Sequence, residues 1–277
     1  VDHAAARMRK RPDADSISME PSDGGGWCQC PKCRDLGSPS DRALMLANGA
    51  AEAINQLGLG EKYVGMYAYN VHCPPPSIRV HPNVIVSVAT GFIRGNLTLE
   101  EIMTGWDARG ATLGIYDYFS VVAWDWNRPR KARAARPHDL ADRIELYHDR
   151  GARFFDAESG DAWGPYGLGY YIAGRVMWDV DRAERVDAII EDFLTHAFGP
   201  AKEPMAKFYR LINEDRTRRS TTDIVGRMYR HIARARELAK GNERVLERLN
   251  DLTLYTRYVE LYAAQSSATG QGKKVAR

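Results

Sequence analysis

The chain has 277 residues, a formal net charge of +3 and a sequence pI of about 8.6. This length allows one large domain, or one domain with an extension, and the weak basicity gives no support for a nucleic-acid-binding protein. The dense basic runs, Arg7–Arg11 and Arg128–Arg136, contain no interleaved aromatic residues of the kind that line a strand-binding groove. No stretch is long and apolar enough to predict a membrane span.

Strand and helix patterns alternate through the first part of the chain. Residues 1–13 are polar and basic and predict the end of a helix. Helices are then predicted at Asp41–Leu57 with Ser40 as N-cap, at Leu99–Ala108 with Thr98 as N-cap, and at Leu140–Arg150. The predicted strands are Asp15–Glu20, Tyr63–Tyr69, Val84–Ala89, Leu113–Tyr118 and Ala152–Ala157.

This alternation indicates an α/β fold with a parallel sheet and covering helices. A complete eight-unit barrel needs roughly 250 residues, and about 160 are available here. We therefore predict the C-terminal part of a (β/α)8 TIM-type barrel, whose N-terminal units lie upstream of this chain.

Helical periodicity replaces the strand signals after Gly164. The expected helices are Tyr166–Trp178, Ala183–Ala197, Glu203–Asn213, Thr221–Ala239 and Glu243–Ala264. We therefore expect three regions: a partial barrel over residues 1–164, a helical extension over 165–265, and a disordered tail, rich in Ser, Gly and Lys, over 266–277.

Carboxylates and aromatic rings follow the predicted strands, where a parallel barrel has its active site. Glycoside cleavage needs an acid for the leaving oxygen and a second group that supports the oxocarbenium-like centre. Sugar faces also pack on aromatic rings, and the chain has 14 Tyr and 6 Trp. The predicted catalytic residues are Glu20, Asp23 and Glu158. The predicted substrate-binding residues are Trp27, Tyr67, Tyr69, Tyr116, Asp117, Tyr118, Trp163 and Tyr166.

Each of these residues also has a structural interpretation. Asp23 lies in a Ser-Asp-Gly-Gly segment that favours a turn, and Glu20 could cap the same turn. Tyr67 and Tyr69 share one face of a strand and could fill a barrel interior. Glu158 could pair with an arginine such as Arg175. The convergence of several strand ends, rather than any single residue, favours a site.

Three cysteines form the pattern C-x-C-x₂-C at Cys28, Cys30 and Cys33. Together with Cys73 or His72, they could form a tetrahedral structural zinc site that holds the loop. The usual structural spacing has two separated C-x₂-C pairs, so a disulfide in an oxidising compartment stays open as the alternative. No other cofactor is predicted, and a catalytic metal is not expected because no open nitrogen and oxygen site is evident.

The segment S-M-E-P-S-D-G-G-G-W-C-Q-C-P-K-C-R, followed by S-D-R-A-L-M-L-A-N-G-A-A-E-A-I, resembles a bacterial family catalogued as domain of unknown function 4838. Further similar motifs are Y-V-G-M-Y-A-Y, H-P-N-V-I-V, G-W-D-A-R-G, I-Y-D-Y-F, G-A-R-F-F-D-A-E-S, Y-Y-I-A-G-R-V-M-W-D and F-G-P-A-K-E-P-M. The resemblance covers roughly Ser16 to Asn213. The family that it resembles underlies glycoside hydrolase family 163, whose characterised activity is endo-β-N-acetylglucosaminidase on N-glycans.

This resemblance implies a glycosidase barrel with carboxylates at its strand ends. Asp23 matches the family's Asp before the cysteines, Glu158 matches its acidic position after a late strand, and Tyr116 and Tyr118 match its tyrosine-rich strand. The insert Trp124–Arg136 departs from the family pattern, which puts the substrate in doubt. The resemblance also implies a secreted or periplasmic bacterial protein of polysaccharide degradation, although the N-terminus itself gives no localisation.

Two main hypotheses follow. The first is a glycosidase that cleaves β-linked, N-acetylglucosamine-containing glycans, with the substrate's acetamido group as a possible nucleophile. The second is a non-catalytic carbohydrate-binding barrel, and a zinc-stabilised interaction module is a more remote third. We expect this chain by itself to be inactive, because absent barrel strands would remove half of the cleft and expose a sheet edge.

Overall fold

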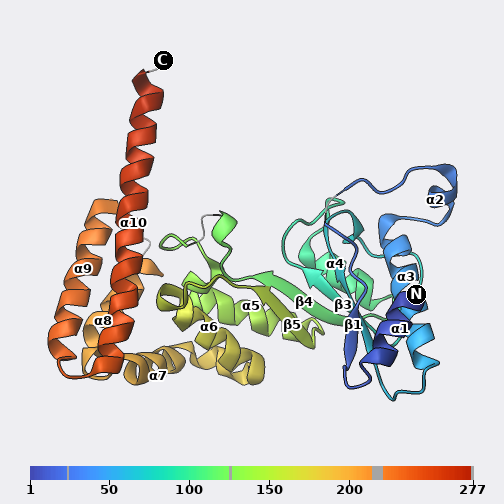
Figure 1. Cartoon of the computed structure of the whole chain (residues 1–277), viewed down its shortest axis with the longest axis horizontal. Helices are drawn as coiled ribbons and strands as arrows, with labels where there is room; N and C mark the ends of the chain where they lie inside the picture. The colour runs from blue at the N-terminus through green and yellow to red at the C-terminus, as the bar shows by residue number, and fades with distance from the viewer. Residues whose placement is uncertain (24, 125–126, 214–220, 276–277) are drawn as a thin grey trace. The chain divides into compact units, whose positions relative to one another are not determined.

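The computed structural model (Figure 1) describes residues 1–23, 25–124, 127–213 and 221–275, and it forms two compact units. The first unit comprises Val1–Tyr118 and Leu146–Glu158, and the second comprises Phe119–Glu145 and Ser159–Arg277. Most of the segment between the last two strands, Phe119–Glu145, therefore groups with the later helices.

A five-stranded parallel sheet forms the centre of the first unit. The strands are β1 (Ser16–Ser18), β2 (Tyr63–Ala68), β3 (Val84–Ala89), β4 (Thr112–Tyr118) and β5 (Phe154–Glu158), and they lie in chain order as a curled half-barrel. All four neighbouring pairs are parallel. This confirms the predicted α/β class, and all the carboxyl ends lie along one edge of the sheet.

Four helices of the first unit pack on one face of this sheet, namely α1 (Asp2–Lys10), α3 (Pro39–Asn55), α4 (Leu99–Asp107) and the end of α5 (Pro137–Asp149). The short helix α2 (Pro31–Asp35) has no buried residue and belongs to the loop after β1, and a short 3-10 turn, η1 (Asn70–His72), follows β2. Strand residues alternate between buried and half-buried, as in β2, where Val64, Met66 and Ala68 are buried. Leu44 of α3 and Trp106 of α4 pack into the same core. The opposite face of the sheet is therefore left for a site.

Helix α3 begins two residues earlier than predicted. Its N-cap is Ser38 rather than Ser40, since Pro39 occupies the first helical position and Asp41 completes a capping box with Ser38. The second carboxylate oxygen of Asp41 accepts hydrogen bonds from the N–H (2.6 Å) and hydroxyl (2.8 Å) of Ser77. Burial of Asp41 opposes its ionisation, but the bonds from Ser38 and Ser77 outweigh this effect and lower its pKa to about 2.

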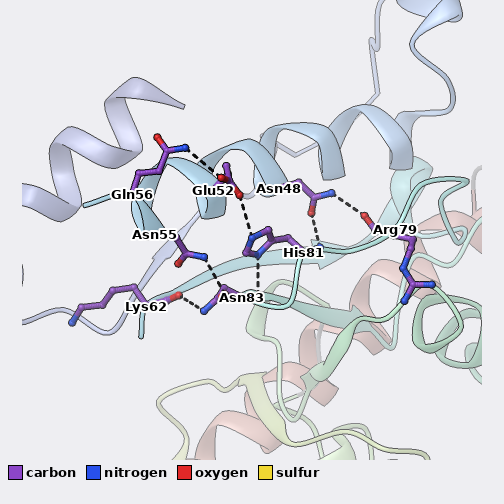
Figure 2. A network of polar contacts seen from close by, with 8 residues as sticks. All are labelled: Asn48, Glu52, Asn55, Gln56, Lys62, Arg79, His81 and Asn83. Atoms are coloured by element: carbon purple, nitrogen blue, oxygen red, sulfur yellow. Dashed lines mark hydrogen bonds and ion pairs between the residues drawn. The ribbon is translucent and has the colours of Figure 1, made fainter. Parts of the chain in front are cut away.

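A polar network ties α3 to the chain entering β3, at the amino ends of the strands (Figure 2). Asn48 donates to the Arg79 carbonyl and accepts from the His81 N–H, both at 2.9 Å. Asn83 donates through Nδ2 to the Lys62 carbonyl at 3.0 Å, and its N–H donates to Nδ1 of His81 at 3.1 Å. These bonds satisfy backbone groups of the loop before β3, so they indicate a structural role for this end of the sheet.

The second unit is helical, as predicted. It contains α6 (Trp163–Trp178), α7 (Val186–Phe198), α8 (Lys202–Ile212), α9 (Thr221–Leu238) and α10 (Glu243–Val275), with 3-10 turns at Val122–Trp124, Arg133–Ala135, Val180–Arg185 and Gly199–Ala201. Helices α9 and α10 pack side by side (Figure 1). Helix α10 includes residues 266–275, which the sequence placed in a disordered tail. Among the described residues, no helix is long and apolar enough to cross a membrane.

Candidate functional site

Two tyrosines meet on the open face of the sheet, near its carboxyl edge. The ring centroids of Tyr67 in β2 and Tyr116 in β4 are 4.5 Å apart, although β3 lies between their strands. The β3 partner of Tyr67 is Ser87, and the β3 partner of Tyr116 is Ala89. Because these two β3 side chains are small, they leave room for the tyrosine rings to meet above β3.

Each of these tyrosines donates its hydroxyl to a carboxylate of β5. Tyr67 donates to Oδ2 of Asp156 at 3.2 Å, and Tyr116 donates to Oε1 of Glu158 at 2.7 Å. Asp156 and Glu158 are two residues apart in the same strand, so they share a face. Tyr67 and Tyr116 are half-buried, as is Glu158, whereas Asp156 is exposed. Tyr67, Tyr116, Asp156 and Glu158 therefore form an aromatic and acidic cluster that is accessible to solvent.

Glu20 lies just beyond β1 and adds a third carboxylate to this edge. Its Oε2 accepts a hydrogen bond from the backbone N–H of Tyr67, and its Oε1 lies 3.3 Å from Nε2 of His72. The Glu20 side chain is 21% exposed and the His72 side chain only 3%. Glu20 is therefore a hydrogen-bond acceptor with a fixed position that links the end of β1 to β2. Its contacts extend beyond the turn that follows it in the chain.

The loop after β1 brings two predicted residues to the same edge. Asp23 is exposed and is hydrogen-bonded to Tyr69, which follows β2. Trp27 packs against His72 with ring centroids 5.7 Å apart, and the guanidinium of Arg42 lies 5.2 Å from the centroid of Trp27. The loop is thus joined to the sheet through ring contacts as well as through Asp23.

Burial and the neighbouring carboxylates raise the pKa values of three tyrosines in this region. Burial, together with the charge of Asp156 and the hydrogen bond to it, raises the pKa of Tyr67 to about 12. Burial and the hydrogen bond to Glu158 raise the pKa of Tyr116, and burial and the charge of Asp23 raise that of Tyr69. At neutral pH these hydroxyls are donors that hold carboxylates in place.

Two of the predicted binding residues are buried at the end of β4. Asp117 is fully buried, because it alternates with Tyr116 and Tyr118 and so points to the helix-covered side, where it accepts from Oγ1 of Thr90 (2.5 Å) and from the Tyr118 N–H (2.8 Å). Tyr118 is 2% exposed and packs edge-on against Phe92. Both residues support the strand end instead of lining its surface.

Trp163 and Tyr166 belong to α6 of the second unit. Tyr166 is fully buried and donates its hydroxyl to the Arg128 carbonyl at 2.9 Å, so it is a core residue there. Trp163 is 64% exposed and packs against Tyr170 at the rim of a cavity of about 540 Å³ within this unit. Their contacts are therefore with the helical unit.

The cysteines separate into a group of three and a single buried residue. The Sγ atoms of Cys28, Cys30 and Cys33 all lie within 4.8 Å of one another, and no disulfide links them. Cys73 is buried elsewhere, and its Sγ accepts from the Arg94 N–H at 3.1 Å. In the part of the chain that the structure describes, neither Cys73 nor His72 joins the group, which corrects the predicted fourth ligand.

The structure adds two residues to the predicted site, His72 beside Glu20 and Asp156 beside Tyr67. The position of Asp156, two residues before Glu158 in a strand, is a sequence signal for this placement. The position of His72 depends on the 3-10 turn after β2, and no periodicity indicates it.

Comparison with known proteins gives a single informative result. No curated protein and no solved structure matches the chain at a significant level. A family model described as "Domain of unknown function (DUF4838)" matches residues 1–210, which include the whole sheet and its carboxyl edge. The chain therefore belongs to the DUF4838 family.

Proposed function

We propose that this chain is part of a glycoside hydrolase acting on β-linked, N-acetylglucosamine-containing glycans, and that its sheet is five units of a (β/α)8 barrel. The observation that carries the proposal is the pair of tyrosine–carboxylate contacts, Tyr67 with Asp156 and Tyr116 with Glu158, on the open face at the carboxyl edge. Parallel α/β barrels have their active sites at that edge. Glycosidases in turn need two acidic groups around the scissile bond.

Glu158 is the better candidate for the general acid. The Tyr116 hydroxyl engages only one of its oxygens, Oε1, and Glu158 is half-buried, so the carboxyl group is fixed in position while its second oxygen remains for a substrate. Glu20 is less suitable, because the Tyr67 N–H and His72 engage both of its oxygens. We assign Glu20 to holding the strand ends and to stabilising positive charge.

Asp23 is the candidate that orients a substrate acetamido group or stabilises its charge. It is exposed, and its contact with Tyr69 fixes it beside the sheet. In a substrate-assisted reaction the acetamido oxygen attacks the anomeric carbon while the acid protonates the leaving oxygen, and water then opens the cyclic intermediate. Trp27, Tyr67, Tyr69 and Tyr116 would offer rings to the sugar face.

The experiment compares Asp23→Asn and Glu158→Gln with the parent sequence, in the full gene product that contains this chain. Hydrolysis of a β-N-acetylglucosaminide should fall by roughly a hundredfold or more in each variant. Glu247→Gln is the matched control, because Glu247 is an exposed residue of α10. Unchanged hydrolysis in both site variants would overturn the assignment.

A non-catalytic carbohydrate-binding protein is the second candidate. The observation that favours it is the full engagement of Glu20, which leaves this carboxylate without a free oxygen. Under this alternative, oligosaccharides bind to the parent protein with measurable heat but are recovered intact. Tyr116→Phe would then change affinity alone, since no hydrolysis occurs.

Zinc at the cysteines would be structural, and no catalytic step needs it. The bacterial, secreted or periplasmic setting and the role in polysaccharide degradation follow from the family resemblance alone.

A further inference from the structure

Three cysteine side chains of the first unit gather in a way that the glycosidase proposal does not use. All three Sγ atoms of Cys28, Cys30 and Cys33 lie within 4.8 Å of one another, and Cys28 and Cys30 are exposed. A tetrahedral zinc ion with zinc–sulfur bonds of about 2.3 Å holds two of its sulfur ligands roughly 3.8 Å apart. The observed grouping is thus close to that of a metal–thiolate site.

The backbone around Cys30 creates this convergence. Cys30 is the residue before α2, Pro31 is the first helical residue, and the Cys30 carbonyl accepts from the N–H groups of Cys33 (3.1 Å) and Arg34 (3.0 Å). This tight turn brings Cys33 back beside Cys30. Before Cys30 in the chain, the Cys28 carbonyl accepts a hydrogen bond from Nη1 of Arg42 at 2.8 Å. This bond anchors the loop around Cys28 to α3.

We propose that Cys28, Cys30 and Cys33 bind one Zn²⁺ ion through their thiolates, with a water molecule as the fourth ligand. Soft thiolates prefer zinc over magnesium or calcium. Three thiolates and one Zn²⁺ leave one negative charge, and the basic residues Lys32, Arg34 and Arg42 lie on the same segment or contact it. Within the described ranges, no fourth Cys, His, Asp or Glu joins the group, so the remaining ligand comes from solvent.

The bound metal would stabilise the segment that carries Trp27. This segment has little regular structure apart from the five residues of α2, so few backbone hydrogen bonds hold it. Trp27 immediately precedes Cys28, and its ring packs on His72 and under Arg42. Since metal binding and local folding are coupled, zinc would fix Trp27 at the edge of the aromatic and acidic cluster.

Metal content of the purified, fully reduced protein tests the proposal. We expect one zinc per chain, loss of that zinc in Cys28→Ser, Cys30→Ser and Cys33→Ser, and retention in Cys73→Ser, the matched control at the buried cysteine. Replacement of zinc by Co²⁺ should give the intense charge-transfer and visible absorption bands of a tetrahedral thiolate site. Circular dichroism of the exposed Cys30→Ser variant verifies that it folds.

Hydrogen exchange tests the structural role independently of any enzymatic activity. Removal of zinc by a chelator should accelerate exchange in residues 27–36 and leave residues 84–89 of β3 unchanged. The proposal is overturned if the reduced protein takes up no zinc, if Cys73→Ser loses it as completely as the other variants, or if chelation leaves residues 27–36 unaffected. A disulfide between two of the three cysteines, with no zinc uptake after reduction, would also overturn the proposal and would show that the cysteines form a disulfide instead of a zinc site.

Discussion

The hydroxyl of Tyr116 donates a 2.7 Å hydrogen bond to Oε1 of Glu158, from one strand to its neighbour at the carboxyl edge of the sheet. The backbone partner of Tyr116 in β5 is Asp156, so the bond to Glu158 runs diagonally along the face that the two strands share. This contact fixes the orientation of the proposed acid and makes Tyr116 a positioning residue.

Replacement of Tyr116 by Phe removes this bond and keeps the ring. A hydrogen bond to a charged group contributes about 1.5–3 kcal/mol, so kcat/KM for glycoside hydrolysis should fall about 10- to 100-fold. Tyr63→Phe, at the amino end of β2, is the control and should retain full activity. Equal losses in both variants would contradict a specific role for Tyr116.

Asp41 should make the stability of the first unit depend on acid pH. Its pKa is about 2 in the folded chain against an ordinary value of 3.8, so the unfolded state binds the proton more readily. The stabilisation, about 2 kcal/mol, is therefore fully present above about pH 4 and is lost as the pH falls through about 2.

Denaturant unfolding at a series of pH values measures this effect. The parent chain should lose stability between pH 4 and pH 2 more steeply than Asp41→Asn, which lacks the titrating carboxyl. Asp41→Asn should be the less stable protein at pH 7, because it loses charged acceptors for Ser38 and Ser77. If the free energy of unfolding depended on pH in the same way for the two proteins, the Asp41 carboxylate would not stabilise the fold through its contacts with Ser38 and Ser77.

Two helical glycines should respond in opposite ways to alanine. A Cβ on Gly105 of α4 would lie 2.1 Å from Cγ of Pro75, whereas a Cβ on Gly174 of α6 would meet no atom within 4 Å. Gly105→Ala should destabilise the first unit by about 1–3 kcal/mol through overpacking. Gly174→Ala should stabilise the second unit by up to about 1 kcal/mol through helix propensity.

The unfolding midpoints of the two variants check this pair directly. Because both substitutions are glycine to alanine within a helix, the difference isolates the contact with Pro75. Stabilisation of similar size in both variants would mean that α4 and the Pro75 loop separate easily.

The regular elements of this chain were predictable because their signals are local. Val84–Ala89 is a short apolar run, and β3 has these same bounds. The predicted cap at Thr98 is confirmed, with Glu101 completing the capping box. The predicted cap at Ser40 was wrong, although Ser38, Pro39 and Asp41 together carry the signal of a capping box that begins two residues earlier.

The grouping of side chains at the strand ends was predictable from the sequence, whereas the burial of individual residues was only partly so. Strand ends pointed to Tyr67, Tyr116 and Glu158, which lie together. Strict alternation along β4 could have excluded Asp117, whose neighbours Tyr116 and Tyr118 face the other way. The burial of Tyr118 could not be predicted, because the loop after β3 places Phe92 against it. Loop conformations depend on tertiary contacts that no sequence period records.

The most direct test of the central claim compares two substrates for Glu158→Gln in the full gene product. An acid that protonates the leaving oxygen matters most when the leaving group is a poor one. With an N-acetylglucosaminide whose leaving group is another sugar, the rate should fall by roughly 10²- to 10⁴-fold. With a highly acidic phenol as leaving group, the first step should be nearly unaffected. An equal fall with both substrates, or no fall with either, would contradict the assignment of Glu158 as the general acid.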